Sequence, residues 1–189
     1  MKRVLYTIIG LLMVWGCQEN YKPKPQGFLA LNFPEPEYKN IRKDCPFTFE
    51  VNKNAVIKTP KTNRDCNFDI VYPNSKGVIY ITYEKVNDNL EKLLADAQQL
   101  PLKHTIKADE ISGDEYVNHA RQTFGMLYTV TGDAASQAQF YITDSTDNFM
   151  TGSIYFRRTP NYDSIFPAAE YIKDDMKKLM ETLEWKNRE

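Results

Sequence analysis

Apolar and polar positions alternate through residues 121–162, and this pattern predicts three strands separated by two polar breaks. In the first strand, apolar side chains occupy every second position from Phe124 to Val130, while threonines lie on the other face. Period-two alternation is typical of a half-buried strand. The other two strands cover residues 139–143 and 149–156, and the breaks are rich in Gly, Asp, Ser and Asn, which favour turns. The region therefore predicts a three-stranded antiparallel meander.

Further strands are predicted before the meander. Lys76–Glu84 is the strongest, because Ile79 and Ile81 lie opposite Val78 and Tyr80, so both of its faces can be buried and it should be central. Gly113 and Asp114 are typical of a turn. The other expected strand regions are Phe28–Phe33, Phe47–Val51, Ala55–Lys58, Phe68–Tyr72 and His104–Ile111.

Two helices are expected. The first begins at Asp88, which forms a capping box with Glu91, and it ends before Pro101. The second is capped by Ser164, and Trp185 at its end packs back on the sheet. Its apolar stripe recurs every three or four residues and comprises Ile165, Ala168, Ile172, Met176, Leu179 and Leu183.

These elements predict a single globular α+β domain over residues 28–189. Its sheet is largely antiparallel, ends in the C-terminal three-stranded meander and is covered by the two helices. The order of elements is similar to that of Mog1/PsbP-like domains, a likeness of fold that implies no function.

The N-terminus predicts export and lipid anchoring. Residues 1–16 have a basic start and an apolar run too short to span a bilayer, as in a secretory leader. The Gly16-Cys17 pair resembles a bacterial lipobox, in which the cysteine is lipidated; the alternative is an ordinary leader with a free Cys17. Residues 17–27 then form the lipid anchor and a proline-containing extended tether.

The two remaining cysteines, Cys45 and Cys66, are expected to form a disulfide in an exported protein. Closing this loop contributes about 3 kcal/mol to stability. A redox pair is the alternative, but the Cys-x-x-Cys spacing is absent. With only His104 and His119 as histidines and no ligand cluster, we expect no metal and no cofactor.

Charge argues against nucleic acid as a partner. The 189 residues include 24 basic and 25 acidic side chains, a formal net charge of -1, and no concentrated basic patch is visible. Phosphate binding needs such a patch.

Catalytic motifs are not apparent, and we expect no enzyme. Ser136 and Asp144 could be combined with His104 or His119, but no nucleophile elbow accompanies them. The run Asp144–Asn148 is acidic but lacks the Gly and terminal Glu of an EF-hand loop, so a solvated turn is expected. The alternative function is a periplasmic ligand-binding or hydrolytic domain, with a pocket near Gly132–Ser136 and Asp144–Asn148.

Aromatic residues are abundant, and most fill a core, but exposed ones beside arginines are typical of an interface. The candidate interaction surface comprises Tyr155, Arg157, Arg158, Asn161 and Tyr162.

Several runs carry a family likeness over nearly the whole mature chain. They include the lipobox-like Cys17, the Cys45 and Cys66 pair, KGVIYITY (76–83), AAS (134–136), QFYITDS (139–145), GSIYF (152–156) and PNYDS (160–164). Together they resemble the GldD family of gliding motility lipoproteins.

The resemblance implies an envelope-anchored, non-enzymatic component of the gliding and type IX secretion machinery of Bacteroidetes-type cells. Its partners would be the membrane, through the lipid, and other gliding or secretion lipoproteins and motor components. No catalytic residues are carried over. Gln18 stands where inner-membrane lipoproteins commonly have Asp, so we expect the outer membrane, facing the periplasm.

Overall fold

The computed structural model describes residues 33–41, 44–59, 66–103, 107–157 and 162–186, and it confirms the α+β fold. Within these ranges the elements, in chain order, are β1 (Tyr38–Asn40), β2 (Phe47–Thr48), β3 (Glu50–Asn52), β4 (Val56–Lys58), β5 (Phe68–Tyr72), β6 (Gly77–Lys85), α2 (Leu90–Leu102), β7 (Ala108–Asn118), β8 (Thr123–Gly132), β9 (Ala138–Thr143), β10 (Asn148–Phe156), α3 (Tyr162–Thr182) and β11 (Glu184–Trp185).

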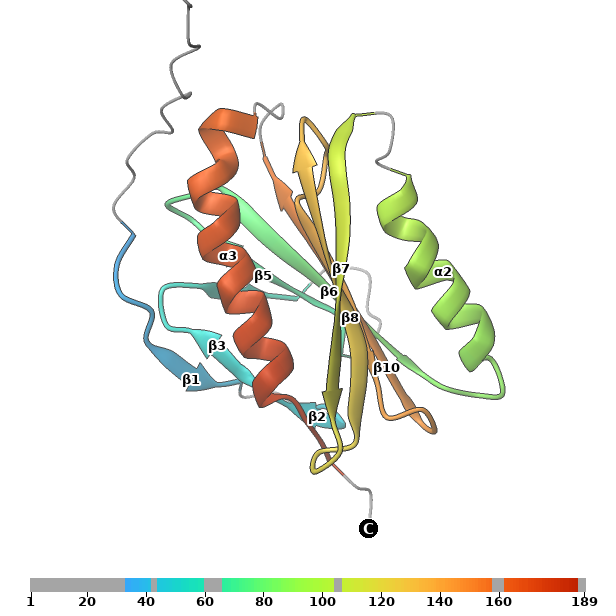
Figure 1. Cartoon of the computed structure of the whole chain (residues 1–189). Coiled ribbons are helices and arrows are strands. Elements are labelled where there is room, and N and C mark those ends of the chain that lie inside the picture. The colour runs from blue at the N-terminus through green and yellow to red at the C-terminus, as the bar shows by residue number, and fades with distance from the viewer. Residues whose placement is uncertain (1–32, 42–43, 60–65, 104–106, 158–161, 187–189) are drawn as a thin grey trace, which may run out of the picture.

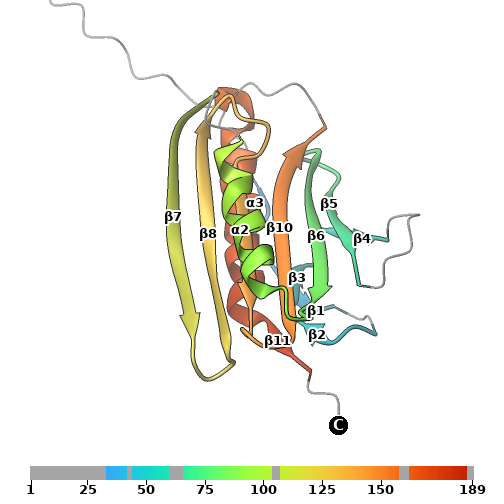
Figure 2. The same cartoon turned by 90° about the vertical axis from the view of Figure 1, so that its right-hand side faces the viewer.

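Seven of these strands form one antiparallel sheet in the order β4-β5-β6-β10-β9-β8-β7. The predicted meander is confirmed as β8, β9 and β10. Between β6 and β7 the chain passes through α2, which carries it from the interior of the sheet to the far edge (Figure 2). Two short strand pairs, β1 with β3 and β2 with β11, lie outside this sheet.

The two faces of the sheet are covered differently. The long helix α3 lies across one face, and the segment containing β1 to β3 packs beside it (Figure 1). Helix α2 lies on the other face, in front of β8 to β10, and leaves β4, β5 and β6 uncovered by any helix of the described chain (Figure 2). The large sheet is therefore sandwiched fully at its centre and only on one face at its β4 end.

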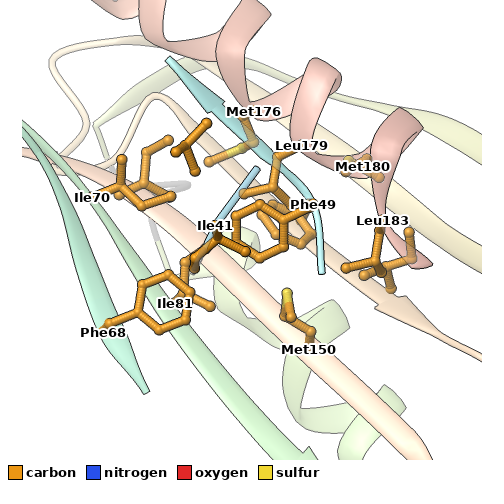
Figure 3. Packing of buried hydrophobic residues seen from close by; sticks show 14 of the residues in the cluster. Ile41, Phe49, Phe68, Ile70, Ile81, Met150, Met176, Leu179, Met180 and Leu183 are labelled. Carbon is orange, nitrogen blue, oxygen red and sulfur yellow. The ribbon is translucent and has the colours of Figure 1, made fainter. Parts of the chain in front are cut away.

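The main core lies between α3, the β1–β3 segment and the sheet. Figure 3 shows α3 side chains including Met176 and Leu179 pointing toward Phe49, with Phe68 and Met150 contributed by the sheet. The predicted stripe of α3 is thus buried from Ala168 onward, whereas Ile165 is half-buried, and fully burying one such side chain contributes roughly 1.5–3 kcal/mol. A smaller core lies under α2, where the rings of Tyr141 and Phe149 stack 5.9 Å apart.

In the N-terminal half, one predicted strand is divided in two and one strand, β1, was not predicted. Phe47–Val51 is not one strand but parts of two, because Phe47 pairs with Trp185 whereas Val51 pairs with Lys39 of β1. The two halves follow different partners, so the ladder is interrupted between them. Residues 28–32 of the expected first strand lie outside the described residues.

The predicted turn at Gly113 and Asp114 is wrong, because both residues lie inside the long strand β7. A Cβ at position 113 would come within 3.3 Å of atoms of Met126 and Tyr128, so glycine there leaves room for the Tyr128 ring. The turn lies instead at residues 119–122. Of the expected strand region His104–Ile111, residues 104–106 lie outside the described chain and β7 begins at Ala108.

Both predicted helix caps are also wrong. Asp88 has a φ of 54°, and the N-cap of α2 is Asn89, whose side chain accepts a hydrogen bond from the N–H of Asn87. Pro101 lies inside α2 and does not follow it. Helix α3 begins before Ser164, at Tyr162, whose N–H donates to the carboxylate of Asp133 at 2.9 Å. A side chain 29 residues away in sequence therefore accepts a hydrogen bond from the first turn of α3.

Candidate interaction surface

An apolar row crosses the uncovered part of the sheet. The register places Val56, Val71, Val78 and Tyr155 side by side on β4, β5, β6 and β10. Tyr80 lies on the same face, and its ring meets that of Tyr155 edge-on, with centroids 5.7 Å apart. We call these five residues the open face.

Exposure on the open face is high for its aromatic and outer residues. Val56 is 46% exposed, Tyr80 43% and Tyr155 36%, whereas Val71 and Val78 are buried between them. The prediction that both faces of β6 are buried is therefore wrong at Tyr80. The reason is tertiary: α2 packs on β9 and β10 and does not extend over β6.

Charged side chains border the open face. Lys58, Asp69 and Tyr80 form the next row across β4, β5 and β6. Burial raises the pKa of the Asp69 carboxyl above its usual range, while the positive charges of Arg157 and Lys58 oppose part of that rise. Arg157 and Lys76 are exposed at the end of the sheet where β6 begins and β10 ends. The N–H of Arg157 donates to the carbonyl of Lys76. The border is thus predominantly basic.

The structure divides the predicted interaction surface. Tyr155 and Arg157 are exposed at the end of β10, on or beside the open face. Tyr162 instead begins α3, on the other side of the sheet, and its ring lies 5.3 Å from that of Phe166. Arg158 and Asn161 lie outside the described residues. Tyr80 and Val56 were missed, although the alternation of β6 already placed Tyr80 opposite Ile79 and Ile81.

A cavity of about 380 Å³ lies beside the loop Asp144–Asn148. Besides that loop, it is lined by residues of four separated segments, among them Tyr83, Gln122 and Lys186. The location matches part of the pocket expected for a ligand-binding or hydrolytic domain. The other part, Gly132–Ser136, lies at the opposite end of β9, and six strand residues separate the two loops by roughly 20 Å. The expected joint pocket is therefore not formed.

Asp144 organises its own loop. One of its carboxylate oxygens accepts hydrogen bonds from the N–H groups of Thr146, Asp147 and Asn148 at 2.9–3.0 Å, and the other accepts from the Asn148 amide. Burial opposes ionisation, but these donors together hold the pKa of Asp144 below its usual range. The carboxylate is committed to the turn, as expected for a solvated hairpin loop.

The other candidate catalytic residues are not brought together. Ser136 is fully buried, and its hydroxyl donates to the carbonyl of Ala138 at 3.2 Å. His119 lies near the β7–β8 turn with its ring against Phe124, 5.8 Å away. His104 is outside the described residues. Within the described ranges, no group of three or more His, Cys, Asp or Glu side chains could hold a metal ion.

Sequence reasoning missed a buried polar cluster around Asp175 on α3. Its carboxylate accepts hydrogen bonds from the Tyr38 hydroxyl at 2.7 Å and from the Asn52 amide at 2.8 Å, and the same amide donates to the Tyr171 hydroxyl. Burial raises the pKa of Asp175, although the hydrogen bonds from Tyr38, Asn52 and Tyr72 oppose that rise. The cluster joins β1 and β3 to α3.

Spacing could have revealed this cluster. Asp175 lies three residues after Ile172 and four before Leu179, so it falls on the buried stripe of α3. A charged residue at such a position must find hydrogen-bond partners, because an unpaired buried charge is costly. The tyrosines and the asparagine supply them.

The Asp175 cluster also lies where the described chain begins. Phe33 stacks on Tyr171 with centroids 4.7 Å apart, and the Tyr171 hydroxyl donates to the carbonyl of Pro34. The segment that follows residues 1–32 is therefore fixed against α3, on the side of the sheet away from the open face. Cys17, the expected lipid site, lies outside the described residues.

A disulfide joins Cys45 to Cys66, whose Cα atoms are 5.6 Å apart. It connects the segment just before β2 to the segment just before β5, near the β4 end of the sheet. Within the described ranges, no helix has both the length and the apolar character needed to cross a membrane.

Comparison with known proteins gives one result. The family model for the gliding motility lipoprotein GldD matches residues 18–185, nearly all of the chain after the expected leader. No curated protein matches the chain. The match spans the sheet, both helices and the open face, and the chain belongs to the family of gliding motility lipoproteins named GldD.

Proposed function

We propose that this gliding motility lipoprotein is a non-enzymatic component that assembles or stabilises the gliding and type IX secretion machinery. A lipid on Cys17 would hold it at the outer membrane, facing the periplasm, with residues 17–27 as its tether and residues 28–189 as a single domain. Its partners would be other gliding or secretion lipoproteins and motor components. The observation that carries this proposal is the open face.

The chemistry of the open face indicates the kind of partner. Two exposed tyrosines beside an arginine have the composition of an interface centre, where Tyr and Arg are enriched. The exposed cations Lys58, Lys76 and Arg157 border it, and Asp69 is a partly buried carboxyl among them. Charge complementarity therefore favours a partner surface with an apolar or aromatic centre and acidic residues around it.

Photo-crosslinking in living cells tests this proposal. A photoreactive amino acid would replace Tyr80 or Tyr155 in the full chain, and a matched variant would carry it at Lys177, which is exposed on α3. We expect positions 80 and 155 to crosslink to gliding or secretion components and position 177 not to do so. Equal crosslinking from all three positions, or none from 80 and 155 in gliding cells, would contradict the proposal.

Substitution separates binding from folding. Replacing both Tyr80 and Tyr155 by Ser removes the exposed rings and leaves the two core clusters intact, because neither side chain belongs to them; the only apolar surface it uncovers is that of the open face itself, at Val78. We expect normal protein levels, loss of the crosslinked partners and loss of gliding. Gliding that persists in the double variant would argue against this surface.

Anchoring is tested by Cys17→Ala. If the lipid is required, this variant should accumulate without membrane attachment and should not support gliding. Gliding restored by soluble protein would contradict anchoring.

The alternative, a periplasmic ligand-binding domain, would use the cavity at Asp144–Asn148. Its volume falls in the range of ligand pockets, but such pockets are mostly apolar, whereas polar side chains predominate here. Native mass spectrometry decides between the two: a retained small-molecule mass that is lost on Tyr83→Phe or Gln122→Ala would favour the cavity.

A further inference from the structure

The outer edge of β7 is a second exposed feature, separate from the open face. β7 is 11 residues long, pairs with β8 on one side, and ends the sheet on the other. Figure 2 shows no described element beyond it. At the opposite end of the sheet, the edge strand β4 has only three residues. Long free edges are uncommon because their unpaired backbone groups can pair with another chain.

The backbone groups that face outward can be identified from the register. The N–H of Val130 donates to the carbonyl of Gln137. This bond continues the β8–β9 ladder by one residue beyond the pair Thr129 and Ala138. Because antiparallel strands alternate the side to which they bond, even-numbered β8 residues bond to β9 and odd-numbered ones to β7. In the β7–β8 register the odd-numbered β8 residues face even-numbered β7 residues, such as Ser112 opposite Thr129. The outward N–H and C=O groups therefore belong to Ile111, Gly113, Glu115 and Val117.

Within β7 itself every charged side chain is acidic, whereas Lys107 just before the strand and Arg121 in the β7–β8 turn are basic. β7 carries Asp109, Glu110, Asp114 and Glu115 and no lysine or arginine. Its neighbour β8 carries no charged side chain. Acidic residues on β7 lie on both faces, because Asp114 and Glu115 are adjacent and point to opposite sides. Val117, 48% exposed, adds apolar surface at one end.

We propose that the outer edge of β7 binds an extended, basic segment of a partner protein, which adds an eighth strand to the sheet. Main-chain hydrogen bonds to Ile111, Gly113, Glu115 and Val117 would hold the segment, and its Lys or Arg side chains would meet the four carboxylates. A second copy of this chain is a poor occupant, since edge-to-edge pairing would bring together four carboxylates from each strand. This proposal does not depend on the open face.

Amide hydrogen exchange of the purified full chain in detergent micelles tests the proposal. The probe is a ten-residue peptide of alternating Lys and Thr, and the matched control alternates Glu and Thr. With the Lys peptide at ten times its Kd, exchange of the amides of Ile111, Gly113, Glu115 and Val117 should slow about tenfold. The Glu peptide should have no effect.

Two variants of Glu115 separate the backbone from the charge. Glu115→Pro removes an outward N–H, which edge strands tolerate, and should abolish protection of the neighbouring outward amides. Glu115→Gln keeps that N–H and should weaken binding only modestly, with a smaller dependence on salt. Unchanged exchange of the β8 amides confirms that each variant is folded.

A version of the Lys peptide with every backbone nitrogen methylated provides a second test, made on the peptide instead of on the protein. It keeps every charge but cannot form the ladder, so it should not bind the unaltered protein. This result does not depend on whether the Glu115→Pro variant folds. Binding of the methylated peptide, equal binding of the Glu peptide, or protection confined to Tyr80 and Tyr155 would each overturn the proposal.

Discussion

The two ends of the seven-stranded sheet expose different kinds of surface. At the β4 end, one face of β4, β5 and β6 is left uncovered, and what it offers is side chains: Tyr80, Tyr155 and Val56. At the β7 end, the exposed feature is an edge, and what it offers is backbone N–H and C=O groups among carboxylates. The short β4 edge offers little backbone, and among the described residues the β7 end has no comparable pair of exposed tyrosines.

This difference predicts two modes of recognition in one domain. A surface of side chains discriminates by shape and composition, whereas a strand edge accepts many sequences and selects mainly by charge. The two ends are separated by the full width of the sheet, so changes at one should leave the other intact. The predictions below test that independence, from the largest expected effect to the smallest.

Removing the disulfide should give the largest effect. Changing both Cys45 and Cys66 to Ala should lower the free energy of unfolding by about 3 kcal/mol, because the unfolded chain regains the freedom of the closed loop. Urea unfolding of the purified protein measures it. Native-state hydrogen exchange should accelerate more in β4 and β5 than in β7 and β8, where only the loss of global stability contributes. Equal acceleration at both ends would refute their independence, and free thiols in the native protein would refute the disulfide.

Asp175→Ala should come next. It leaves the Tyr38 hydroxyl and the Asn52 amide without their acceptor, while relieving the cost of burying a carboxylate, for a net loss of about 2 kcal/mol. Thermal unfolding measures the loss. Lys177→Ala on the exposed side of the same helix is the control, and a loss of similar size there would show that the effect is one of helix stability alone.

Gln139→Leu should stabilise the protein. Gln139 is buried between Ser153 and Tyr128, and neither end of its carboxamide has a hydrogen-bond partner among the described residues. An apolar side chain of similar volume avoids that desolvation cost, so a gain of about 1 kcal/mol is expected from chemical unfolding. Gln139 lies between the two ends of the sheet, and neither crosslinking at Tyr155 nor peptide binding at β7 should change. A loss of stability would indicate that the carboxamide is satisfied in solution.

Asp69→Asn should give the smallest effect, and that effect should depend on pH. Because burial raises the pKa of Asp69 in the folded protein, the wild type loses stability as pH rises from the ordinary carboxyl pKa through the raised one. The Asn variant lacks this loss, so it should match the wild type at low pH and be slightly more stable at neutral pH. Unfolding midpoints measured across this range provide the test, and an advantage confined to low pH would reverse the assigned sign.

Local pattern was sufficient for much of the sheet and for both helices. The period-two runs of β8 and β10 and the 3.6-residue stripe of α3 each specify a buried face without reference to other elements. Features that depend on a distant partner were not accessible in this way. Gly113 has turn chemistry but lies in a strand, paired with Tyr128 of β8, and the N–H of Tyr162 in the first turn of α3 donates to Asp133, 29 residues away.

The candidate surface was foreseen only in part for the same reason. Alternation places Tyr80 on one face of β6, but whether that face is buried depends on where α2 lies, and α2 covers β9 and β10. The free edge of β7 likewise follows from strand order, since β7 is bonded by β8 alone among the described strands. Local periodicity specifies neither the position of α2 on the sheet nor the order of the strands.

The sequence by itself therefore determined the α+β class, the meander, the two helices and the family likeness, because side-chain period and distinctive runs are local properties. Only the tertiary structure decided which tyrosines are exposed, which strand forms the edge and how Asp175 is satisfied. Those features arise when segments far apart in the chain meet: α2 with β9, Tyr38 with Asp175, and Phe47 with Trp185. Burial and pairing are properties of such contacts, and a residue's neighbours in sequence do not fix them.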